Sequence, residues 1–335
     1  MTWRVLAGSE IGTAHIQTGR TCEDSCWAQV LQTREGQPFL AIFVADGAGS
    51  AAQGGDGAEL AMSAAAGFIE KKLKHPELGL GDELAVGCVQ AVRAAIDSAA
   101  TAAGLKPRDY ACTFLGLLSF ERGSLLMQVG DGGIVVDFGD GLEVPIEPMG
   151  GEYANMTCFV TGEDAIEVLQ TKSFSAPVIR AAVFSDGLQR LALNMATNAA
   201  HVPFFKPLFT ALAKSSEEQE DQLAAALQRF LSSEAVNQRT DDDKTLVMAV
   251  LPVSANLPEL VWNEAARPPA PTPVEQSPAT GTAAFETLPG SAPEPLPMDT
   301  PQTAGTPEEA GPSEEPGRTA RQRLAAAAYA KNQEG

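Results

Sequence analysis

The sequence predicts an α+β domain followed by a disordered C-terminal tail. Apolar, strand-like runs follow one another directly along much of the chain, so antiparallel hairpins should outnumber β-α-β crossovers. Two long runs with helical spacing stand together between the early and the later strands. Proline gathers near the C-terminus, where residues 268–316 hold 13 of the 23 prolines. The pattern therefore favours helices layered on a largely antiparallel sheet over a doubly wound parallel sheet.

The hydrophobic pattern predicts each element of the folded part in turn. Alternating or continuous apolar residues between turn residues indicate strands, and apolar residues three and four apart indicate helices. The expected strands are residues 3–12, 25–33, 38–46, 111–120, 124–131, 133–139, 157–162, 178–187 and 245–253. The expected helices are residues 51–74, 82–103, 204–213 and 217–232.

Composition divides the chain into three parts. Residues 1–254 form the expected folded domain, and ~250 residues suffice for one well-buried core. Residues 255–317 mix proline with Ala, Glu, Ser and Thr, so this linker cannot bury enough apolar surface to offset its chain entropy. Residues 318–335 are rich in alanine and arginine and are expected to form a short helix, which either has no role or docks on a partner protein.

Charge and cysteine content narrow the classes of function. The 43 acidic and 23 basic residues give a formal net charge of -20, which argues against a nucleic-acid binder or a binder of anionic membranes. No apolar run reaches the ~18 residues of a membrane span, and the N-terminal residues lack a signal-peptide pattern. The five cysteines have no paired spacing, so we expect reduced thiols in a cytoplasmic protein.

Acidic residues recur where the predicted strands begin or end. A single Asp-Gly pair is a common turn, but several acids beside buried strands indicate a cluster of oxygen ligands. Hard divalent cations prefer such carboxylate and backbone carbonyl oxygens. The acids concerned are Glu23, Asp24, Asp46, Asp131, Asp186, Asp241, Asp242 and Asp243.

Five ordered motifs carry a resemblance to a known family. They read GTAH…CEDS, VADGAGS, ACTFLGLL…QVGDGG, FSDGL and DDKTLVMAV, and they span residues 6–251. The series resembles the metal-dependent protein phosphatase family, the type 2C or PPM serine/threonine phosphatases, and most closely its bacterial branch. The resemblance implies a four-layer α-β-β-α sandwich with two mainly antiparallel sheets.

The resemblance also implies a pair of Mn²⁺ or Mg²⁺ ions at one end of the sandwich. Asp46 would bridge both ions, and the carbonyl of Gly47 would contact one. Two such ions lower the pKa of a shared water and neutralise the phosphate oxygens. The remaining matches are Asp186 and Asp242 for one ion, Asp131 for a weaker third ion, and Glu23 and Asp24 for the paired acids of the opening motif.

Two further residues match catalytic roles less directly. The leaving alkoxide needs a proton from a general acid, and His15 is a candidate by its place in the opening motif. A structural histidine that caps the turn is the alternative. The phosphate-binding arginine of the better-known branch falls on Gly19, so Arg20 would have to bind phosphate from a shifted loop. After Asp131 the sequence departs from the family, because Gly132 and Gly133 replace the polar residue and arginine often found there.

Two hypotheses for the function follow. The first is a Mn²⁺- or Mg²⁺-dependent phosphatase that acts on phosphoserine or phosphothreonine in proteins and opposes a protein kinase, with the tail docking on a partner. The second is a regulatory module that keeps the fold and binds a phosphoprotein without turnover. The complete set of carboxylates favours the first, and the displaced phosphate-binding arginine supports the second.

Overall fold

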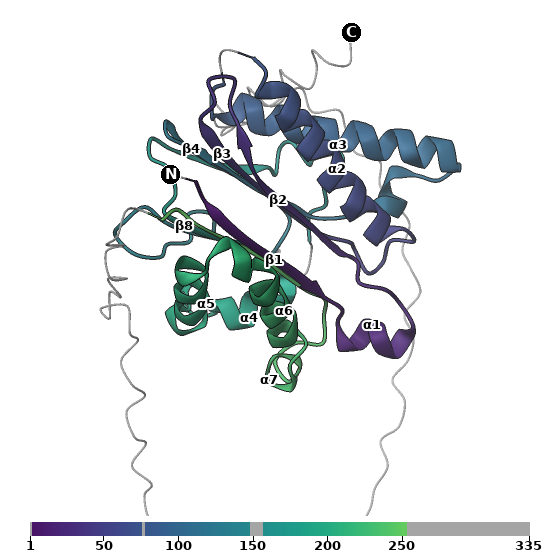
Figure 1. Cartoon of the computed structure of the whole chain (residues 1–335). Helices are drawn as coiled ribbons and strands as arrows, with labels where there is room; N and C mark the ends of the chain where they lie inside the picture. The colour runs from purple at the N-terminus through teal and green to yellow at the C-terminus, as the bar shows by residue number, and fades with distance from the viewer. Residues whose placement is uncertain (1, 76–77, 148–156, 253–335) are drawn as a thin grey trace, which may run out of the picture. The chain divides into compact units, whose positions relative to one another are not determined.

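The computed structural model describes residues 2–75, 78–147 and 157–252 (Figure 1). The predicted linker and terminal helix, residues 255–317 and 318–335, lie outside these residues, as does the predicted boundary at residue 254. Within the described ranges, no helix has both the length and the apolar character needed to cross a membrane.

Two antiparallel sheets form the centre of the domain. The five-stranded sheet has the order β2-β3-β4-β5-β7, and the four-stranded sheet has the order β1-β11-β8-β6. The strands of the first are β2 (Asp24–Gln32), β3 (Pro38–Asp46), β4 (Phe114–Phe120), β5 (Gly123–Val129) and β7 (Gln170–Phe174). Those of the second are β1 (Arg4–Glu10), β11 (Lys244–Val250), β8 (Arg180–Phe184) and β6 (Gly133–Asp137). A short hairpin joins β9 (Leu193–Asn194) to β10 (Ala199–Ala200).

Helices cover the outer face of each sheet, which completes the predicted α-β-β-α layering (Figure 1). On the five-stranded sheet lie α2 (Gly54–Lys72) and α3 (Asp82–Ala103). On the four-stranded sheet lie α4 (Gln189–Ala192), α5 (Val202–Lys214), α6 (Glu220–Leu231) and α7 (Glu234–Asn237). The single-turn α1 (Thr13–Thr18) lies at one end of the sandwich and buries none of its residues.

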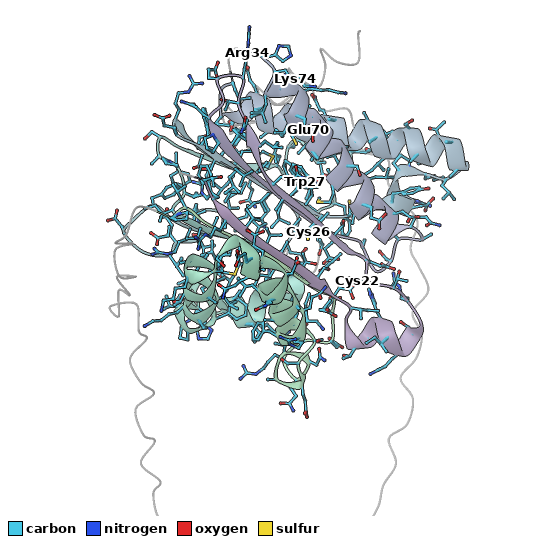
Figure 2. The ribbon with its side chains drawn as sticks, viewed as in Figure 1. Cys22, Cys26, Trp27, Arg34, Glu70 and Lys74 are labelled. Carbon is cyan, nitrogen blue, oxygen red and sulfur yellow. The ribbon has the colours of Figure 1, made fainter. Side chains whose placement is uncertain are left out.

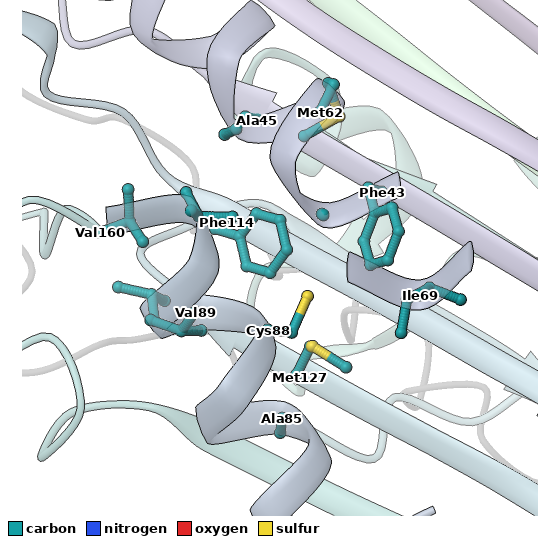
Figure 3. Packing of buried hydrophobic residues seen from close by; sticks show 14 of the residues in the cluster. Phe43, Ala45, Met62, Ile69, Ala85, Cys88, Val89, Phe114, Met127 and Val160 are labelled. Carbon is teal, nitrogen blue, oxygen red and sulfur yellow. The ribbon is translucent and has the colours of Figure 1, made fainter. Parts of the chain in front are cut away.

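Buried side chains fill the three spaces between the four layers. Under α2 and α3, Phe43 and Phe114 stack 5.6 Å apart beside Ile69 and Cys88 (Figure 3). Between the sheets, apolar residues of β3, β4 and β5 meet those of β8 and β11. Fully burying one large apolar side chain contributes roughly 1.5–3 kcal/mol. The inter-sheet layer therefore fixes how the ends of the two sheets face each other.

The structure corrects the predicted strand at residues 157–162. This segment is irregular, and the Arg93 guanidinium bonds the carbonyls of Val160 and Gly162, which a neighbouring strand would otherwise pair. Strand β7 and helix α1 were not predicted, because β7 is largely polar and α1 has no buried face.

All five cysteines are free thiols, as expected. Figure 2 shows Cys22 just before β2 and Cys26 within it. Burial raises the pKa of the Cys22 thiol to about 12, so this thiol stays protonated at neutral pH.

Candidate active site

The register of the strands gathers acids at one end of the sandwich. Asp24 opens β2 and Asp46 closes β3, and the antiparallel pairing places them opposite each other. The backbone N–H of Ser185, just after β8, donates to the carbonyl of Thr245 at the start of β11. Asp186 follows Ser185 directly, so its strand also ends at this edge. Strand ends from both sheets thus supply the acids, as the sequence predicts.

A cavity of about 270 Å³ opens among these strand ends. Its walls combine carboxylates with small and apolar residues from both sheets and from the segment after residue 156. The lining residues are His15, Asp46, Gly47, Ala48, Gly49, Thr113, Asp131, Thr157, Phe159, Asp186 and Asp242.

Thr113 and Gly47 fix the backbone around Asp46. The Thr113 hydroxyl accepts a hydrogen bond from the Asp46 N–H at 2.9 Å, and the Thr113 N–H donates to the Asp46 carbonyl at 2.8 Å. The chain then turns so tightly that a Cβ on Gly47 would lie 2.4 Å from the backbone of Gly54. Only glycine fits this close approach, so the position of the Gly47 carbonyl follows directly from the sequence.

Asp46 and Asp186 both line the cavity, and each carboxylate lies close enough to affect the pKa of the other. Burial, and then the charges of Asp24 and Asp186, raise the pKa of Asp46 well above its ordinary value. Burial, and then the charge of Asp131, raise the pKa of Asp186 to about 6. Each carboxylate is thus costly to ionise without a cation nearby.

Asp24 lies opposite Asp46 on the neighbouring strand and is half-buried. Its Oδ2 accepts a hydrogen bond from the Ser185 hydroxyl at 2.6 Å. Burial is the main cause that raises its pKa, to about 7. In the described part of the chain, the buried Oδ1 atoms of Asp24 and Asp186 have no hydrogen-bond partner. Unpartnered carboxylate oxygens among other acids fit a site for divalent cations.

Within the described ranges, no group of three His, Cys, Asp or Glu side chains is arranged to coordinate one metal ion directly. Mg²⁺ needs no such cage, because it keeps several waters and binds through one or two carboxylates. The acids of this cavity therefore fit ions that are held partly through water.

His15 lies at the cavity wall and is held there by Asp243. Its Nδ1 is 2.9 Å from Asp243 Oδ2, and the two side chains are 12% and 2% exposed. The other Asp243 oxygen accepts the Gly12 N–H at 2.6 Å, and Oδ2 also accepts the Glu23 N–H at 2.6 Å. Asp243 thus joins the start of β11 to the α1 region and to the segment before β2.

Arg20 and Glu23 form an ion pair at the rim of the cavity. The Arg20 guanidinium contacts both Glu23 oxygens, at 2.7 and 2.6 Å for Nη2, and its Nη1 donates to the carbonyl of Gly49 at 3.0 Å. Gly49 lines the cavity, whereas Arg20 and Glu23 do not. The arginine is therefore close to the site, but its planar fork is occupied by Glu23.

Most of the residues predicted from the sequence come together in the structure. His15, Asp46, Gly47, Asp131, Asp186 and Asp242 share the cavity wall. Asp24 lies directly behind it, and Glu23 and Arg20 lie at its rim. Sequence reasoning missed Thr157, whose hydroxyl donates to Asp131 at 2.9 Å, because a single threonine in a predicted strand carries no signal.

Comparison with known proteins places this architecture in a family. The sequence pattern of protein phosphatase 2C matches residues 11–232. Serine/threonine-protein phosphatase 3 of Escherichia coli (strain K12) is 51% identical over 250 residues, which cover 75% of this chain and 99% of that protein.

Solved structures with lower identity were also found. A serine/threonine phosphatase of S. agalactiae has a TM-score of 0.49 at 15% identity, covering 74% of this chain and 99% of that one. The catalytic domain of the phosphatase PstP, solved in complex with two manganese ions, has a TM-score of 0.48 at 20% identity, covering 74% and 97%.

The family pattern and the E. coli relative together settle the assignment. The chain belongs to the protein phosphatase 2C family, and its class of activity is that of a metal-dependent protein phosphatase.

Proposed function

We propose that this protein hydrolyses phosphoserine and phosphothreonine in proteins with the help of two Mn²⁺ or Mg²⁺ ions. The observation that carries the proposal is the set of half-buried carboxylates from the ends of both sheets around one cavity of about 270 Å³. The name of the E. coli relative supports the serine/threonine class of substrate. An opposing protein kinase and a cytoplasmic location belong to the same proposal, the latter supported by the five free thiols.

The proposal assigns a role to each acid of the cavity. Asp46 and the carbonyl of Gly47, both part of the cavity wall, would hold the two ions. Asp186 and Asp242 would hold one of these ions, and Asp131, which accepts the Thr157 hydroxyl, would hold a weaker third. When bound, the ions supply a water of lowered pKa and neutralise the phosphate oxygens.

Asp24 and Glu23 act around this group of ligands rather than within the cavity wall. Asp24 adds negative charge directly behind Asp46. Glu23, predicted as one of the paired acids, has both oxygens on Arg20. It reaches an ion only if this ion pair opens.

Arg20 binds the substrate phosphate in this proposal. An arginine fork recognises phosphate and carboxylate in the same bidentate way. The dianionic phosphate therefore competes with the Glu23 carboxylate for Arg20, and the bond from Arg20 to Gly49 keeps the side chain at the cavity rim during the exchange.

The alternative of a binding module without turnover is not favoured. All the carboxylates expected from the family resemblance are present, and the closely similar E. coli protein is named as a phosphatase.

The deciding experiment measures phosphate release from a phosphoserine peptide by the full chain with Mn²⁺, with Mg²⁺ and with EDTA. We expect activity only with a divalent ion, and a loss of ~10³-fold in Asp186→Asn. The exposed Asp140→Asn is the matched control and should keep wild-type activity. Turnover in EDTA, or full activity in Asp186→Asn, would contradict the proposal.

A further inference from the structure

We propose that the first residues of the C-terminal tail, residues 257–266, dock as a short helix in a groove between α5 and α6. The occupant of the groove is thus a segment of the same chain, which follows the described domain directly. The inference concerns the outer face of the four-stranded sheet and does not depend on the phosphatase function proposed above.

The groove lies where the end of α5 meets the start of α6, and its volume is about 340 Å³. Both helices cover the four-stranded sheet, and the short 3-10 helix Glu217–Gln219 lies between them in sequence (Figure 1). A mixed apolar and polar wall suits an amphipathic helix whose other face stays in water. The lining residues are Ala211, Lys214, Ser215, Gln219, Gln222 and Leu223.

The described chain ends at Pro252, close to this groove. Val250, the last residue of β11, pairs with Arg4 of β1. The Arg4 guanidinium donates to the carbonyls of Ala213 and Ser215, and Ser215 belongs to the groove wall. Residues 253–256 can span up to ~14 Å, at most ~3.6 Å each. The segment that follows them can therefore reach the groove.

The start of the predicted linker differs from the rest of it in composition. Residues 253–262 hold five of the 12 Val, Leu, Met, Phe, Tyr and Trp residues that lie beyond residue 252. Leu257, Leu260 and Val261 have the i, i+3, i+4 spacing that places them on one face of a helix, and Trp262 adjoins them. Burial of this face in the groove would remove four large apolar side chains from water.

The same residues carry the start and stop signals of a short helix. Asn256, followed three residues later by Glu259, is a capping-box pattern, and Pro258 fits the first helical turn. Pro268 ends the pattern, because the residue before a proline disfavours helical angles. A helix of this length is marginal alone in water, so it needs a surface to pack against.

The charges of the segment complement those around the groove. Lys214 is exposed and forms no ion pair with another described residue, whereas Glu259 and Glu264 are the two acids of the segment. Arg267 follows the segment, and the first turn of α6 is acidic. Such surface pairs add little affinity, but they favour one orientation of the docked helix.

The short tether favours this segment over any other occupant. Four residues separate Pro252 from Leu257, and short flexible linkers give effective concentrations of ~1 mM. A helix that binds with a Kd of only ~0.1 mM would then be docked about ten to one. A second copy of the chain, or another protein, would have to reach a similar concentration to compete.

The test is limited digestion of the full chain with chymotrypsin, which cuts after aromatic residues. Trp262 lies in the docked segment, whereas Phe285 lies in the proline-rich part of the tail and provides the reference cut. Cleavage follows the population of the open form, so docking should slow the cut after Trp262 by ~10-fold relative to variants that cannot dock. The reference cut should be equally fast in all of them.

The groove variant combines Ala211→Glu with Gln222→Glu, at two exposed wall positions. Its added bulk and charge should speed the cut after Trp262 by ~10-fold. The matched control combines Ala226→Glu with Gln228→Glu. It adds the same two charges at exposed positions of α6 outside the groove and should resemble wild type.

Leu257→Glu prevents docking from the side of the segment and should speed the same cut by ~10-fold. Combined with the groove variant, it should add nothing further, because both changes break one contact. Leu257 lies outside the described domain, so this variant tests docking even if the groove variant folds poorly.

Three results would overturn the inference. A cut after Trp262 that is as fast in wild type as in Leu257→Glu would mean that the segment does not dock, which leaves the groove to another protein. Protection that is lost in Leu257→Glu but kept in a folded groove variant would place the segment on a different surface. Protection that appears only at concentrations where sedimentation shows a dimer would assign the groove to a second copy of the chain.

Discussion

Replacement of Asp46 by asparagine should stabilise the metal-free domain while it abolishes hydrolysis. Asp46 faces the negative charges of Asp24, Asp186 and Asp242. Two like charges about 4 Å apart repel by about 4 kcal/mol at an effective dielectric constant of about 20. Protonation relieves part of this repulsion in the wild type. We therefore expect the neutral amide to raise the free energy of unfolding by ~1–3 kcal/mol in EDTA at about pH 8.

The assay is thermal unfolding of the full chain with EDTA and with Mn²⁺, beside initial rates on a phosphopeptide. For a domain of this size, 1 kcal/mol shifts the melting temperature by ~2–4 °C, so a rise of ~2–12 °C is expected in EDTA. With Mn²⁺, the ion-induced rise should shrink, and the rate should fall ~10³-fold, which corresponds to ~4 kcal/mol. Asp140→Asn is the surface control for both measurements.

Two results would refute this reasoning. A melting temperature in EDTA that is unchanged or lower in Asp46→Asn would mean that the cavity acids do not repel one another. A rate above about a tenth of wild type at saturating Mn²⁺ would mean that Asp46 does not bridge the ions.

Three further outcomes can be checked on the same protein. In EDTA, the melting temperature should fall as pH rises through about 6 to 7. The pKa values of Asp186 and Asp24 are raised in the folded protein, so the native state keeps protons that the unfolded chain has released, and the stability that these protons provide is lost when the two acids ionise. A melting temperature that rises with pH would contradict this. Thr113→Val should cost ~1–3 kcal/mol in urea unfolding, because it leaves the buried N–H at the end of β3 without an acceptor; a change below ~0.5 kcal/mol would count against it. Gly57→Ala should lower the free energy of unfolding by ~1–3 kcal/mol, since its Cβ would lie 2.1 Å from the Tyr110 carbonyl oxygen. An unchanged melting temperature would contradict this and show that α2 can move aside.

Long periodic segments were predicted well because burial determines their residues directly. The helix predicted at residues 82–103 is α3, Asp82–Ala103, and the strand predicted at residues 38–46 is β3, Pro38–Asp46. The irregular segment at residues 157–162 was predicted wrongly as a strand. Its carbonyls are bonded by Arg93, which lies on a distant helix and leaves no trace in the local pattern.

The acids of the candidate site were predicted from their places at strand ends. Their separate environments were not, since these depend on three-dimensional neighbours. Asp243 adjoins the proposed ligand Asp242 in sequence, yet its oxygens are taken up by N–H groups from the α1 region. Glu23 adjoins Asp24, yet it pairs with Arg20 at the rim. Acids that are neighbours in the sequence thus have different surroundings in the structure and different proposed roles.

The proposed ligands come from the ends of two sheets, and the apolar side chains packed between the sheets contribute to their spacing. Asp46 ends a strand of one sheet and Asp186 follows a strand of the other, and packed sheets lie about 10 Å apart. Leu117 and Val247 belong to the hydrophobic core between the two sheets. Mg²⁺ demands near-ideal octahedral geometry, whereas larger ions tolerate longer bonds. Substitutions that change the volume of this apolar layer can therefore change which ion a phosphatase prefers, even when every ligand stays the same.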